Sequence, residues 1–148
     1  MDGRKEVTAR GIISIGGSVL VAQGKNDPFT HLPGGHVEAG ESPLTSSPAF
    51  RPGRMSNREL QEELGRSASE VRPVTVIENI FDKGATRIHE TLHLFAVKLY
   101  PELRAVPARS AEDHLTFRWI SIGDMDRERL LPPSVYPWVR LIGGKKSI

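Results

Sequence analysis

The sequence predicts an α+β protein in which helices pack on the faces of a mixed β-sheet, as in an αβα sandwich. Two observations support this: β-branched and alternating apolar runs are joined by short glycine-containing turns, and a helical pattern separates two groups of such runs. A chain of 148 residues is long enough to bury one substantial core. Residues 1–148 are therefore expected to form a single domain.

The first group contains three expected strands. Residues 6–15 are rich in β-branched residues and end at Gly16 and Gly17, which are typical of a tight turn. Residues 18–23 are expected to be the hairpin partner of the first strand. Residues 29–32 form a short extended piece that runs into a second glycine turn.

A short helix is expected from about Asn57 to Gly65. Ser56 followed by Glu59 is a capping-box pattern, and Gly65 can take the left-handed conformation that ends a helix. Residues 42–57 contain three prolines and a glycine, so a continuous helix is not expected there.

The second group begins with a long hairpin. Residues 71–82 and 87–100 are the expected strands, and residues 83–86 are the loop between them. A further strand is expected over residues 115–120.

Two helices are expected at the end of the chain. Ser121 can cap a helix over about residues 122–130, and two prolines then stop it. A terminal helix over residues 134–142 would offer Tyr136, Trp138 and Leu141 for packing.

Composition excludes several classes of function. The chain has no cysteine, which excludes disulfides, thiolate zinc sites and a cysteine nucleophile. No apolar run approaches membrane-spanning length and the first residues lack a secretory apolar region, so a cytoplasmic protein without a membrane partner is expected. The net charge of +2 comes from scattered basic residues, which argues against a nucleic-acid partner and suits a small anionic substrate.

The expected helix at 57–65 carries three acids on one side. At about 100° per residue, Glu62 and Glu63 lie within about 60° of Glu59, while Leu60 and Leu64 form an apolar stripe. Three close carboxylates repel one another, and a hard divalent cation such as Mg²⁺ or Mn²⁺ would relieve this. The alternative is a solvated acidic face near a helix N-terminus.

The glycine turn strengthens the metal interpretation. Gly34 and Gly35 allow a close backbone approach to an ion or phosphate, and a backbone carbonyl there could complete a metal shell. Glu41 is available to pair with Arg58 and so join turn to helix. Taken alone, such a turn would be read as an ordinary one; together with the acid helix it is far more specific.

These two segments resemble the halves of a Nudix box, G-x5-E-x7-R-E-U-x-E-E-x-G-U, in which U is apolar. The order of strands and helices around them also looks like that family over most of the chain. Arg66 departs from the final apolar position. The matching residues are Gly35, Glu41, Arg58, Glu59, Leu60, Glu62, Glu63 and Gly65.

The resemblance implies a Nudix-type αβα sandwich that hydrolyses a nucleoside diphosphate linked to another moiety. Glu59, Glu62, Glu63 and the carbonyl of Gly34 would hold Mg²⁺ or Mn²⁺, which would neutralise the pyrophosphate and activate water. Arg58 belongs to the same catalytic set.

The resemblance also implies one glutamate outside the box that serves as base or extra ligand. Glu112 is the first choice and Glu90 the second. The segment from Glu78 to Glu90 is similar to one in relatives that resemble ADP-ribose pyrophosphatases. The alternative for either residue is a surface glutamate.

Further substrate contacts are expected on the strands. Arg10 lies where relatives place a substrate-contacting basic residue, although a solvated edge charge is the alternative. His31, Phe29 and Phe81 could stack on or bond a nucleobase, although strand aromatics usually belong to a core. His89 and His93 share a strand face but lack a third zinc ligand.

The box is interrupted by residues 42–57, which are sixteen residues where the family pattern has seven. Either a loop bulges outward and leaves Glu41 near Arg58, at little entropic cost, or the helix frays and metal binding weakens. We expect the first, with Arg51 and Arg54 near the cleft rim and in reach of phosphate; the alternative is that both are solvated.

Three functions follow from these patterns. The leading one is a metal-dependent pyrophosphohydrolase with a small-molecule nucleotide substrate, and the rival is a non-catalytic Nudix-like module that binds nucleotide or protein. A nucleotide-responsive regulator is a third. The sequence leaves a homodimer open.

Overall fold

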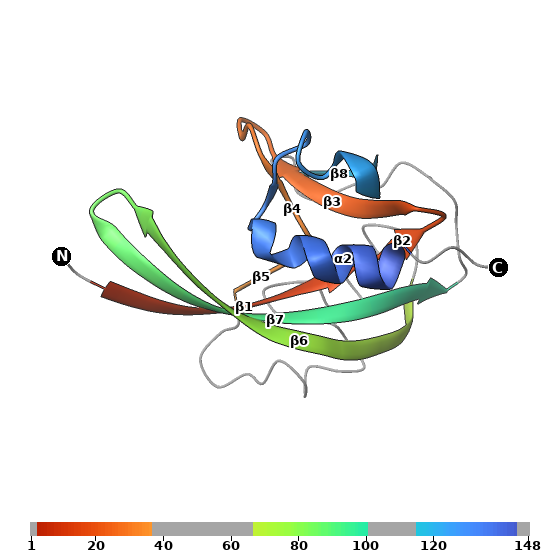
Figure 1. The fold of residues 1–148 in the computed structure, drawn as a ribbon, viewed down its shortest axis with the longest axis horizontal. Coiled ribbons are helices and arrows are strands. Elements are labelled where there is room, and N and C mark those ends of the chain that lie inside the picture. Colours follow the sequence, from red (N-terminus) through yellow and green to blue (C-terminus); the bar gives the residue numbers. More distant parts are fainter. Residues whose placement is uncertain (1–2, 37–66, 101–114, 145–148) are drawn as a thin grey trace.

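The computed structural model describes residues 3–36, 67–100 and 115–144. The first of its two sheets has the strand order β5 (Gly34–His36), β1 (Gly3–Ile12), β7 (Thr86–Tyr100) and β6 (Ser67–Lys83). β1 runs parallel to β7, and the other two pairs are antiparallel. The expected mixed sheet is therefore confirmed (Figure 1).

The second sheet is built around β3 (Ser18–Gly24). Its other strands are β2 (Ser14–Ile15), β4 (Thr30–His31), β8 (Leu115–Ser121) and β9 (Leu130–Leu131). β2 and β3 form the expected hairpin, and Gly16 and Gly17 make its turn with φ angles of 58° and 84°.

The expected single strand over residues 6–15 is wrong in one respect. The chain changes sheets after Ile12, so β1 pairs with β5 and β7, and only β2 pairs with β3. The switch places both Ile12 and Ile13 in the interior, each 1% exposed, in two different apolar clusters. Because a strand alternates its side chains between two faces, consecutive buried residues require a core on both sides.

The long hairpin of β6 and β7 is confirmed, with Gly84 at φ 63° in its turn. Its tip and the start of β1 extend beyond the other elements (Figure 1). Along β7, Ile88, Glu90 and Leu92 are buried and alternate with more exposed neighbours, as expected for a strand with one covered face.

The expected helix over residues 122–130 is wrong. Ser121 does cap a helical turn, since its Oγ accepts from Gly123 N at 3.3 Å, but the 3-10 helix η2 covers only Ile122–Asp124. Turns follow it, Arg129 takes a φ of 54°, and Leu130 pairs in parallel with Thr30. Pairing with β4 has overridden the local helical pattern.

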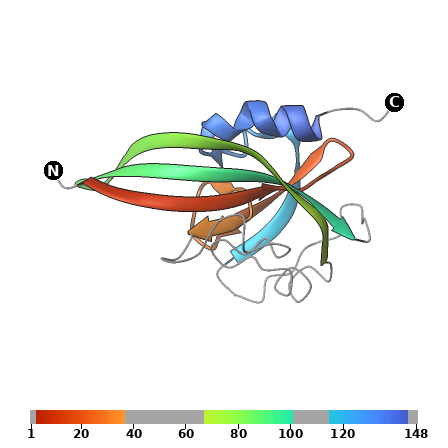
Figure 2. The same ribbon diagram turned by 90° about the horizontal axis from the view of Figure 1, so that it is seen from below.

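The terminal helix is confirmed as α2 (Tyr136–Gly143), preceded by the 3-10 turn η3 (Pro133–Val135). It lies along one side of the first sheet (Figure 2). Tyr136 and Trp138 pack on the core as expected, but Leu141 is 51% exposed and does not. Within the described ranges, no helix has the length and apolarity needed to cross a membrane.

Candidate functional site

The structure describes only part of the predicted site. Arg10, His31, Gly34, Gly35 and Glu90 fall within the described residues and lie on β1, β4, β5 and β7. The helix at 57–65 and the insertion at 42–57 lie outside them. So do the predicted residues Glu41, Arg51, Arg58, Glu59, Glu62, Glu63, Gly65 and Glu112.

Gly34 is held against the backbone of β1. Gly34 pairs with Arg10, and Gly35 pairs with Ala9, so both lie in strand β5 and the turn expected at these two glycines is wrong. Gly34 has a φ of 136°, and a Cβ placed on it would collide with the carbonyl oxygen of Ala9 and lie 2.8 Å from the Cα of Arg10. The glycine is therefore needed for close packing of β5 on β1, and its expected approach to an ion or phosphate stays a prediction.

Arg10 lies on an interior strand and is half-buried, so its interpretation as a solvated edge charge is wrong. Its Nη1 donates to the carbonyl of Leu32 at 2.9 Å and lies 3.3 Å from Nδ1 of His31. Burial lowers the pKa of Arg10, and the nearby charge of Glu90 opposes that change. Among the described residues, its Nε and Nη2 have no hydrogen-bond acceptor.

His31 stands beside Arg10 as a neutral ring. Burial, and next the charge of Arg10, lower the pKa of His31 to about 4. Nδ1 also lies 3.1 Å from the carbonyl of Leu32, so the contacts with Arg10 and with Leu32 call for opposite tautomers of the ring. An imidazolium would place a second cation beside the guanidinium, which burial makes costly.

His31 should make the protein less stable in mild acid. Since its folded pKa lies below the unfolded value, stability is complete above about pH 6.5 and falls as the pH drops toward 4. Between pH 7 and pH 5 the loss from this residue should reach about 2 kcal/mol. Urea unfolding of the wild type and of His31→Gln at both pH values measures it. The same fall in both proteins would contradict the assignment, and His89→Gln, at an exposed position, is the control.

Glu90 is buried, at 7% exposure, so its interpretation as a surface glutamate is wrong. Its Oε2 accepts from Thr8 Oγ1 at 2.9 Å, and its Oε1 accepts from Asn79 Nδ2 at 3.0 Å. Asn79 in turn accepts from the hydroxyl of Ser134 at 2.8 Å. Both carboxylate oxygens are thus held in place.

Three polar residues that bond to Glu90 or to its partner were not predicted as site residues from the sequence: Thr8, Asn79 and Ser134. Thr8 precedes Arg10 by two positions and shares its face of β1, which was a usable signal. Ser134 gave no such signal, because only the fold brings it to β6.

The other predicted side chains are less informative. Phe81 is 42% exposed on the extended hairpin, so a core role is wrong, and a stacking role for Phe81 or for the half-buried Phe29 stays a prediction. Within residues 3–36, 67–100 and 115–144, no three metal-ligating side chains gather.

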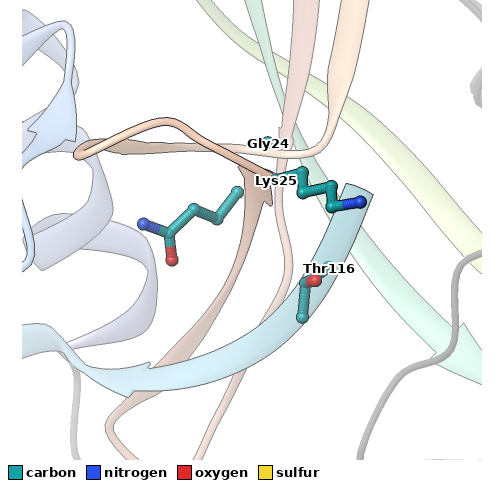
Figure 3. A pocket seen from close by; sticks show the side chains of 4 residues that line it. Gly24, Lys25 and Thr116 are labelled. Carbon is teal, nitrogen blue, oxygen red and sulfur yellow. The ribbon is translucent and has the colours of Figure 1, made fainter. Parts of the chain in front are cut away.

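A separate shallow pocket of about 340 Å³ lies where β3 ends and β8 begins (Figure 3). Gln23, Gly24, Lys25 and Thr116 line it. Gln23 is held there, since it donates to the carbonyl of Asp27 at 2.9 Å and accepts from Arg118. Of the predicted site residues that the structure describes, none is among these four.

No family model matches the chain, and a search of curated proteins finds no similar one. Solved structures do match over most of its length. The ORF135 protein of E. coli is 25% identical with a TM-score of 0.55, covering 93% of this chain and 87% of that one. A Nudix hydrolase from Nitrosomonas europaea is 18% identical with a TM-score of 0.60, covering 93% and 87%.

A UDP-X diphosphatase is 19% identical with a TM-score of 0.60, and the match covers 94% of this chain and 63% of that one. The chain therefore has the Nudix fold, with mixed β-sheets and a C-terminal helix.

Proposed function

We propose that the protein is a divalent-metal-dependent pyrophosphohydrolase that acts on a nucleoside diphosphate linked to another moiety. The position of Gly34 carries the proposal. Gly34 opens strand β5 at the start of the box pattern and pairs directly with Arg10, a partly buried cation with unused donors among the described residues. The likeness to solved Nudix hydrolases supports the same reading of the box.

The proposed metal ligands suit a hard cation. Glu59, Glu62, Glu63 and the carbonyl of Gly34 offer only oxygen atoms, which Mg²⁺ and Mn²⁺ prefer. When bound, the metal would neutralise pyrophosphate charge and supply an activated water.

The remaining residues have separate proposed roles. Arg58 pairs with Glu41 and joins the two halves of the box, and Arg51 and Arg54 contact phosphate. Glu112 is the proposed base. Glu90 is a poorer base, because both of its oxygens already accept hydrogen bonds. We therefore assign it to the substrate-binding set, where it acts through Arg10. The similarity of the segment from Glu78 to Glu90 to one in relatives that resemble ADP-ribose pyrophosphatases supports this.

A substrate panel tests the proposal. ADP-ribose, nucleotide sugars, dinucleoside polyphosphates and oxidised nucleoside triphosphates are incubated with the protein and Mg²⁺, and released monophosphate or phosphate is measured. We expect turnover of at least one class and its loss in excess EDTA, with recovery on adding Mg²⁺ or Mn²⁺. Turnover that survives EDTA would contradict the metal role.

The interrupted box gives the rival function its basis. If the sixteen residues between Glu41 and Arg58 displace the acid helix, the protein would bind nucleotide without hydrolysing it. Binding without turnover across the whole panel would favour that non-catalytic module.

A further inference from the structure

Arg10 and Glu90 form a pair of compensating charges on one face of the first sheet. Thr8 and Arg10 lie two residues apart on β1, so their side chains share a face. Thr8 donates to Glu90 on β7, which places the carboxylate on that same face, and the charge of Glu90 acts on Arg10. The neutral ring of His31 adds no further charge at pH 7.

The two charges differ in what they offer a ligand. Arg10 is half-buried and keeps Nε and Nη2 without acceptors among the described residues. Glu90 is almost wholly buried and both of its oxygens are engaged by Thr8 and Asn79. Arg10 is thus the group that a ligand would contact, and Glu90 is the counter-charge behind it.

We propose that Arg10 is a specificity residue that donates hydrogen bonds to an uncharged acceptor of the nucleoside, on its base or sugar, and that Glu90 disfavours phosphate at this position. The inference rests on the proposed function, since it takes a nucleotide as the ligand. Each negative charge of a phosphate would be attracted by Arg10 and repelled by Glu90 in a poorly solvated site. An uncharged carbonyl, hydroxyl or ring nitrogen gains the hydrogen bonds without that repulsion.

Binding in EDTA separates this inference from catalysis. Dissociation constants are measured by calorimetry for AMP, GMP, CMP, UMP and inorganic pyrophosphate, with wild type, Arg10→Gln, Glu90→Gln and the control Arg127→Gln. Arg127 is an exposed arginine, 80% accessible, with an ion pair to Asp124 at 3.6 Å. The control should bind every ligand as the wild type does.

Arg10→Gln should lower the affinity for the tightest-bound nucleotide about tenfold or more, since hydrogen bonds from a charged donor are lost. Its affinity for pyrophosphate should change less than about twofold, because this position contributes little to phosphate binding. Glu90→Gln should instead raise the affinity for pyrophosphate severalfold, because Arg10 then lacks its counter-charge.

Glu90→Gln is expected to fold. The introduced amide keeps an oxygen that can accept from the Thr8 hydroxyl. Its N–H can donate to the Asn79 side-chain oxygen if the Asn79 amide flips, and the flipped amide then donates to the Ser134 hydroxyl. Far-ultraviolet circular dichroism checks this, and if that variant does not fold, the Arg10→Gln comparison decides alone.

The inference is overturned if Arg10→Gln lowers the affinity for pyrophosphate as much as the affinity for nucleotide, or if the wild type binds none of the four nucleotides. It also fails if a folded Glu90→Gln binds pyrophosphate no better than the wild type. The proposed hydrolysis is tested separately. If nucleotide binding depends on Arg10 but no substrate of the panel is turned over, the recognition role of Arg10 is supported and the hydrolytic activity is rejected.

Discussion

Replacing Glu62 or Glu63 by glutamine is expected to lower kcat/KM for the best substrate at least about a hundredfold, a loss of about 2.7 kcal/mol in transition-state stabilisation. Glutamine keeps the size and one oxygen of the side chain but removes the charge that holds a divalent cation. Steady-state kinetics over a range of Mg²⁺ concentrations measures the loss. The variants should need more Mg²⁺ for half-maximal activity.

The same variants should be at least as stable as the wild type in the absence of metal. Three carboxylates at helical spacing repel one another, so removing one charge relieves that repulsion. Thermal melting in EDTA tests this and separates a lost ligand from a lost fold. Glu78→Gln is the matched control, since Glu78 is an exposed glutamate that accepts from Thr91 at 3.0 Å. Full activity in both Glu62→Gln and Glu63→Gln would remove the metal assignment.

Gly34→Ala is expected to destabilise the protein by roughly 3 kcal/mol or more. The φ of 136° is one that alanine rarely adopts, and the new methyl group would press on Ala9 and Arg10. Both contacts are backbone atoms of an interior strand, which cannot rotate away as a side chain can. Urea unfolding at pH 7 should show a lower midpoint with an unchanged slope.

Comparing Gly84→Ala with Gly34→Ala separates the cost of steric crowding from the cost of a positive φ angle. Gly84 also has a positive φ, of 63°, but a Cβ there would meet nothing within 4 Å. Its replacement should cost only about 1–2 kcal/mol, the penalty for a left-handed residue. Equal losses at Gly34 and Gly84 would show that the packing of β5 on β1 is not the cause.

Much of the fold was predictable because its signals are local. The alternation along residues 87–100, the glycine turns and the proline pair before α2 each constrain only their own neighbours in the chain. The Ser121 cap was predictable for the same reason, since its bond reaches only to Gly123. The length of the helix after Ser121 was not, because Leu130 joins a strand that lies a hundred residues earlier, at Thr30.

Residue types and spacing by themselves predict the chemistry that this chain offers: an acidic segment rich in oxygen ligands at helical spacing, a pair of glycines and basic residues suited to an anionic substrate. Only the tertiary structure decided that β1 is an interior strand beside β7, that Arg10 is partly buried, and that Glu90 binds Thr8 from 82 positions away. Strand pairing and loss of solvent depend on neighbours that are remote in sequence, and no local pattern encodes them.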